Sequence, residues 1–63
     1  MTDEQKSRFV ALKGAWSAMR EHRRRPEMAT DLDAAIRAFL KLHRAETDTI
    51  VLKAFREWQV RGG

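Results

Sequence analysis

The 63-residue sequence contains no cysteine, a single proline and only three glycines. The lack of cysteine excludes a disulfide framework, a thiolate metal site and a cysteine nucleophile, and it leaves a reducing cytoplasm allowed. Apolar runs such as Ile50-Val51-Leu52 are far shorter than the roughly 20 residues of a membrane span. Met1 leads into polar TDEQK instead of the apolar stretch of a signal peptide. We therefore expect a soluble, cytoplasmic protein without a membrane segment.

Size and charge bear on the number of domains, the type of partner and the oligomeric state. A chain of 63 residues is expected to form one small domain over residues 1–63. Its formal charge of +4 and its pI near 10.4 permit an acidic partner, although net charge alone decides neither fold nor task. Only 17 large apolar side chains follow Met1. So small a core, with no disulfide or metal to support it, predicts association, and we expect a homodimer.

The sequence predicts an all-α fold, because no stretch alternates like a strand and the composition favours helices. Helices are expected at about residues 3–25, 31–46 and 48–61. Thr2 and Gln5 have the spacing of a capping box at the N-terminus of the first helix. Pro26 should end that helix, before a turn over residues 26–30. Its apolar stripe is formed by Phe9, Leu12, Trp16 and Met19, whose register Arg23 continues.

A second stripe on the first helix consists of small residues, namely Ala11, Gly14, Ala15 and Ala18. Two interpretations of Gly14 stay open at this point. Either it admits close approach by a neighbouring helix, or the site tolerates a glycine that costs about 1 kcal/mol relative to alanine.

The second helix should start at Thr30-Asp31 and present Leu32, Ile36, Phe39 and His43 on one face. Residues 44–50 contain neither glycine nor proline, so two architectures are compatible with the sequence. An unbroken helix would make a hairpin that dimerises into a four-helix bundle, whereas a break would make a three-helix unit. The last apolar stripe, with Val51 and Phe55, is out of register with the second helix. We therefore favour a break near residues 46–49, with Thr47 or Asp48 as the cap.

Four acid–base pairs at spacing four are expected to support the helices: Glu4 with Arg8, Glu21 with Arg25, Asp33 with Arg37, and Glu57 with Arg61. Gly62 and Gly63 should end the last helix as a C-terminal cap.

The residues offer no catalytic constellation. Ser7 and Ser17 lie ten positions apart, and His22 and His43 fall on different elements. Neither histidine has a metal-ligand partner at helical spacing, and there is no glycine-rich phosphate loop. We expect a non-enzymatic protein with no cofactor and no metal, in which His43 is a partly buried packing residue.

The arginine cluster Arg20, Arg23, Arg24 and Arg25 has two interpretations. Cations at a helix C-terminus oppose the helix dipole and need no ligand. As a functional surface, the cluster would bind a protein partner or grip the phosphates of a nucleic acid. If the cluster binds nucleic acid, the surface would be completed by Lys41, Arg44, Lys53 or Arg56, provided that the helices bring them together. No helix-turn-helix pattern accompanies the cluster, because the third segment is apolar.

A further group of large side chains can be core, a self-association surface or a partner surface: Trp16, Met19, Val51, Phe55 and Trp58. An amphipathic membrane helix is disfavoured by acids in every segment. The sequence therefore predicts a small helical interaction protein, of the bacterial or phage accessory type, that inhibits, recruits or regulates a larger protein. The alternative is a small basic nucleic-acid-binding regulator that uses residues 20–25.

Overall fold

The fold is all-α, and the three-helix unit is confirmed. The computed structural model describes residues 1–25, 27 and 31–62, and within them it contains three helices and no strand. These are α1 (Asp3–Arg24), α2 (Leu32–Ala45) and α3 (Thr49–Val60), each slightly shorter than expected. The helix break falls at residues 46–48, within the predicted region, so the unbroken hairpin is excluded.

Local sequence signals explain most of the helix ends. The Thr2 hydroxyl accepts from the Gln5 backbone N–H at 3.2 Å, and the Gln5 side chain accepts from the Thr2 N–H at 2.8 Å. Asp48 caps α3, since its carboxylate accepts from the Ile50 N–H at 2.9 Å. Arg25 is extended, as expected for a residue before proline. Gly62 has φ +94°, the left-handed conformation that glycine adopts readily after a helix.

At the α1–α2 connection one expected feature is not found, and another falls largely outside the described residues. Asp31 is the N-cap residue of α2, but its side chain makes no capping hydrogen bond. Thr30 and most of the turn expected over residues 26–30 lie outside the described residues, as does Gly63.

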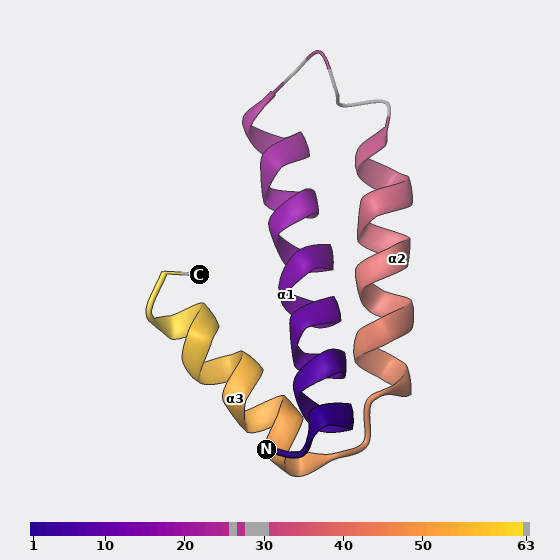
Figure 1. Cartoon of the computed structure of the whole chain (residues 1–63). Helices are drawn as coiled ribbons and strands as arrows, with labels where there is room; N and C mark the ends of the chain where they lie inside the picture. Colours follow the sequence, from indigo (N-terminus) through magenta and orange to yellow (C-terminus); the bar gives the residue numbers. More distant parts are fainter. Residues whose placement is uncertain (26, 28–30, 63) are drawn as a thin grey trace.

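The three helices pack around α1. Both α2 and α3 contact α1, whereas no Cα atom of α2 lies within 8 Å of one in α3. Figure 1 shows α2 beside α1 along most of its length and α3 diverging from the lower part of α1. The predicted stripes supply the core, in which the buried side chains are Leu12, Met19, Phe39, Val51 and Phe55. Phe9, Ala15, Trp16 and Trp58 pack against it while half-buried.

Aromatic rings bridge the space between α2 and α3. The Phe39 and Phe55 ring centroids are 5.7 Å apart, and Trp16 of α1 lies 5.3 Å from Phe39 and 6.3 Å from Phe55. The Trp58 ring lies 5.7 Å from that of Phe55. We call these four rings, together with the imidazole of His43, the aromatic layer. It provides the packing between α2 and α3, whose backbones do not approach each other.

The small-residue stripe of α1 is covered only at Ala15, which packs half-buried against the core. Ala11, Gly14 and Ala18 are exposed, and a Cβ atom added to Gly14 would meet nothing within 4 Å. Of the two interpretations of Gly14, the structure therefore supports a tolerant, solvent-facing site. None of the described helices has the length and hydrophobicity needed to cross a bilayer.

Candidate interaction surface

The four clustered arginines have different surroundings in the structure. Arg25 pairs with Glu21, with its Nε 2.6 Å from the carboxylate, which confirms that predicted pair. Arg20 donates from Nη1 to the carbonyl oxygen of Gly62 at 3.2 Å, and this contact joins α1 to the end of α3. Arg23 and Arg24 are exposed and form no ion pair or hydrogen bond with the described residues. The cluster is thus not one uniform group of four cations.

Arg20, Arg23 and Arg24 surround a shallow hollow beside Trp16. This hollow has a volume of about 260 Å³ and, among the described residues, is lined by those four. A second hollow of about 280 Å³ adjoins it and is lined by Ser17, Arg20, Glu21, Arg24 and Gly62. We call Trp16, Arg20, Arg23 and Arg24 the arginine–tryptophan surface. Sequence spacing explains it, because Arg20 lies one helical turn after Trp16 and Arg23 lies seven residues after it.

The basic side chains of α2 and α3 line other hollows. Arg37, Lys41 and Arg44 line a separate hollow on α2. Arg37 and Lys41 each lie two residues from buried Phe39, which places them about 200° around α2 from its core face. Lys53, Arg56 and Arg61 line a further hollow on α3, together with Glu57 and Val60. The helices therefore divide the positive charge among separate surfaces.

The predicted group of five large apolar residues divides into buried and half-buried members. Met19, Val51 and Phe55 are 5%, 0% and 2% exposed, so they form the core of this chain and no surface. Trp16 and Trp58 are half-buried and keep part of their rings accessible. Of the five, only the two tryptophans can contact a partner in this structure.

His43 differs from its expected environment. Its ring packs 5.5 Å from Phe39 and 6.2 Å from Phe55, but the residue is exposed and not partly buried. It covers the edge of the aromatic layer, because α2 and α3 are too far apart to enclose it. No group of three or more metal-ligating side chains occurs among the residues that the structure describes.

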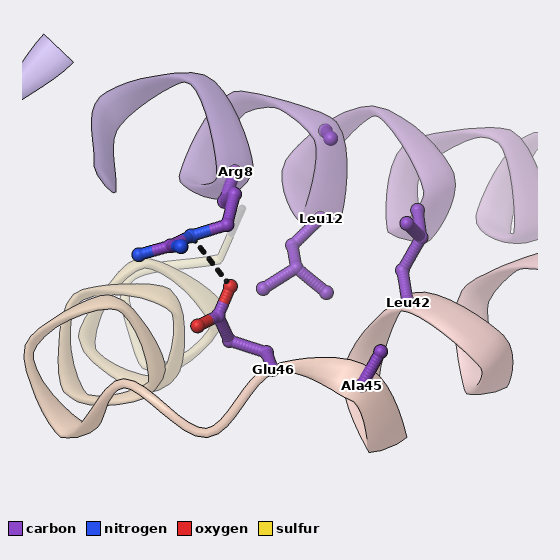
Figure 2. Close-up of a pocket in the computed structure, with 6 residues that line it drawn as sticks. Arg8, Leu12, Leu42, Ala45 and Glu46 are labelled. Carbon is purple, nitrogen blue, oxygen red and sulfur yellow. Dashed lines mark ion pairs between the residues drawn. The ribbon is translucent and has the colours of Figure 1, made fainter. Parts of the chain in front are cut away.

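A polar cluster that the sequence reasoning missed joins α1 to the α2–α3 connection. Arg8 Nε lies 3.1 Å from Glu46 Oε2, and Arg8 Nη2 lies 3.3 Å from Asp48 Oδ2. Gln5 Nε2 donates to the same Asp48 oxygen at 2.8 Å, and the Asp48 N–H donates to Glu46 Oε1 at 3.0 Å. Figure 2 shows Arg8 reaching from α1 to Glu46, beside Leu12, Leu42 and Ala45. This cluster holds the helix break against α1.

The polar cluster replaces a predicted local pair. Arg8 was expected to pair with Glu4, but it binds Glu46 and Asp48 instead. The pairs Asp33–Arg37 and Glu57–Arg61 are likewise absent among the described residues, where Glu21–Arg25 is the only one of the four that forms. The pKa of Asp48 is held below its ordinary value, first by the hydrogen bond from the Gln5 side chain and next by that from the Ile50 N–H. The positive charge of Arg8 lowers it less. The one sequence signal for the cluster was Asp48 as a helix cap.

The chain matches no known protein-family model, no curated protein and no solved structure.

Proposed function

We propose that the chain is a non-enzymatic interaction module that binds a larger cytoplasmic protein and thereby inhibits, recruits or regulates it. The observation that supports this proposal is the amount of surface that the folded chain leaves uncovered. Folded monomers of this mass expose about 4,200 Å², whereas this chain of 7.4 kDa exposes 4813 Å². The surplus of about 600 Å² approaches the roughly 800 Å² that each partner hides in a standard interface.

The uncovered surface includes large apolar side chains. Ile50 is 54% exposed and Val60 is 82% exposed, and Leu40 and Leu42 are each exposed by about two fifths. Trp16 and Trp58 add half-buried indole rings, which are a residue type enriched at the energetic centres of protein interfaces. A protein partner would remove these groups from water.

Self-association is part of the proposal, because a second copy can cover the same apolar groups. A homodimer would have twice the mass of the 7.4 kDa chain. Light scattering over a micromolar concentration range is expected to return the dimer mass. A monomer mass throughout that range would exclude self-association and leave the larger protein as the partner.

A nucleic-acid-binding regulator is the second candidate. It is favoured by Arg23 and Arg24, which are exposed and form no ion pair with the residues that the structure describes. It has less support, because the Arg25 guanidinium is paired with Glu21 and the basic residues of α2 and α3 line separate hollows. Phosphate binding usually uses several cations along one continuous path.

Affinity capture tests the main proposal against this alternative. The immobilised chain is exposed to extract of the cell that encodes it, treated with nuclease and washed at physiological salt. A protein retained in fixed proportion to the chain supports the proposal, and the double variant Leu40→Gln and Ile50→Gln is the control for apolar contacts. Retaining no such protein, while duplex DNA binds with steep salt dependence, would overturn it in favour of the regulator.

A further inference from the structure

The C-terminal part of α1 extends beyond the end of α3. At 1.5 Å per residue, α1 is about 33 Å long and α3 about 18 Å. The contact from Arg20 to the Gly62 carbonyl marks where the chain that follows α3 meets α1. Arg23 and Arg24 lie one turn further along α1, and Figure 1 shows this end of the helix rising above α3. On that side α3 does not cover α1.

The side chains on this uncovered side form a compact group of cations next to an aromatic ring. Arg23 and Arg24 lie three and four residues after Arg20, so the three side chains line the same hollow as Trp16. Capping does not account for all of them. Neither Arg23 nor Arg24 hydrogen-bonds a backbone carbonyl of the described residues. Both interact favourably with the dipole of α1, and their N–H donors are available to a ligand.

Carboxylates are the ligands that this group fits best. A guanidinium binds a carboxylate through two parallel N–H donors, and an indole ring accepts the aliphatic part of an adjacent side chain. The shallow hollow of about 260 Å³ has room for a few side chains. The basic residues of α2 and α3 line other hollows, whereas a phosphate chain would need a longer continuous row of cations. This separation favours a short acidic segment over a nucleic acid.

We propose that the arginine–tryptophan surface binds a short acidic segment of a protein partner. Carboxylates of the segment pair with Arg23 and Arg24, and its apolar groups pack on Trp16. This inference rests on the proposed function, since it assigns the chemistry of the partner that the module would bind.

The test uses Trp16 as its own reporter. In a Trp58→Phe background, Trp16 is the only tryptophan. The probe is a short tryptophan-free peptide of glutamate and leucine, titrated at low salt while the emission of Trp16 is recorded. Binding is expected to change the emission, and the double variant Arg23→Gln and Arg24→Gln is expected to weaken the affinity about tenfold, because two charge-assisted contacts are lost.

The matched control removes the same charge elsewhere. Arg37→Gln with Lys41→Gln also deletes two cations, but from the hollow on α2, and all four residues are exposed so that folding is retained. The control is expected to weaken binding less than about threefold, since only diffuse, screened attraction is lost. Circular dichroism is used to check that both variants keep their helices.

Three results with these probes would overturn the inference. One is no peptide binding at low salt, and another is equal weakening in the control variant, which would indicate general attraction to a basic protein. The third is tighter binding of a DNA duplex of matched charge that depends on Arg23 and Arg24. If the wild-type chain captures a protein that the Arg23 and Arg24 variant also retains, this inference fails while the proposed function stands.

Discussion

Replacing Phe55 with alanine should remove a large part of the stability of this fold. Phe55 is 2% exposed and is one of two buried residues by which α3 is anchored. Because no Cα atom of α2 lies within 8 Å of one in α3, side chains alone connect those helices. The Phe55 ring lies 5.7–6.3 Å from four other rings, those of Trp16, Phe39, His43 and Trp58.

The expected loss is about 3–5 kcal/mol, the usual cost of truncating a buried phenylalanine to alanine. At 0.05–0.15 kcal/mol per residue, a chain of this length is stable by about 3–9 kcal/mol, so the variant should be close to unfolding. Val60→Ala is the control on the same helix, because Val60 is 82% exposed. That change should alter the free energy of unfolding by less than about 0.5 kcal/mol.

Urea titration followed by circular dichroism measures both variants, and tryptophan emission reports separately on the aromatic layer. The Phe55→Ala curve should shift to much lower urea, with the emission of Trp16 and Trp58 resembling that of the unfolded chain. A loss below about 1.5 kcal/mol would refute the reasoning, because it would mean that the ring contacts do not hold α3 in place.

The other predictions concern single exposed or capping positions. Gly14→Ala should stabilise the chain by about 0.5–1 kcal/mol, since the helix gains propensity and the new Cβ meets nothing, and a lower melting temperature would contradict this. Asp48→Ala should destabilise the chain more than Asp48→Asn, because asparagine keeps the cap on Ile50, and equal denaturation midpoints would argue against the cap. The pKa of Asp48 is lower in the folded state, so its stabilising contribution is present above the unfolded pKa of about 3.9 and is lost as pH falls through the folded pKa. Acid titration of wild type should therefore show a step below about pH 4 that Asp48→Asn lacks.

Several local features follow directly from the sequence. The capping box at Thr2 and Gln5 and the cap at Asp48 were predictable, because each depends on residues within three positions of one another. The buried positions Leu12 and Phe39 followed from apolar spacing at the helical period. The change of register before Val51 also predicted the helix break, because one straight helix cannot keep both stripes on one side.

The candidate site was predictable in its residues but not in its arrangement. The run at Arg20–Arg25 is visible in the sequence, and the spacing of Glu21 and Arg25 predicted their pair. Only the structure shows that Arg20 binds the Gly62 carbonyl while Arg23 and Arg24 are exposed. Trp16 and Trp58 could not be distinguished from Phe55 by spacing alone. Their exposure depends on the angle at which α3 leaves α1, and no local signal specifies that angle.

The amino-acid sequence by itself determined the three helices, the N-terminal caps of α1 and α3, and the apolar faces, because hydrogen bonds and side-chain periodicity within a helix depend on near neighbours. Only the tertiary structure decided that Arg8 binds Glu46 and Asp48 instead of Glu4, and that the basic residues of the three helices form separate surfaces. The physical reason is that an ionic partner is chosen by distance in space. Residues 38 and 40 positions apart are brought within 4 Å of Arg8 when the helix break folds back on α1.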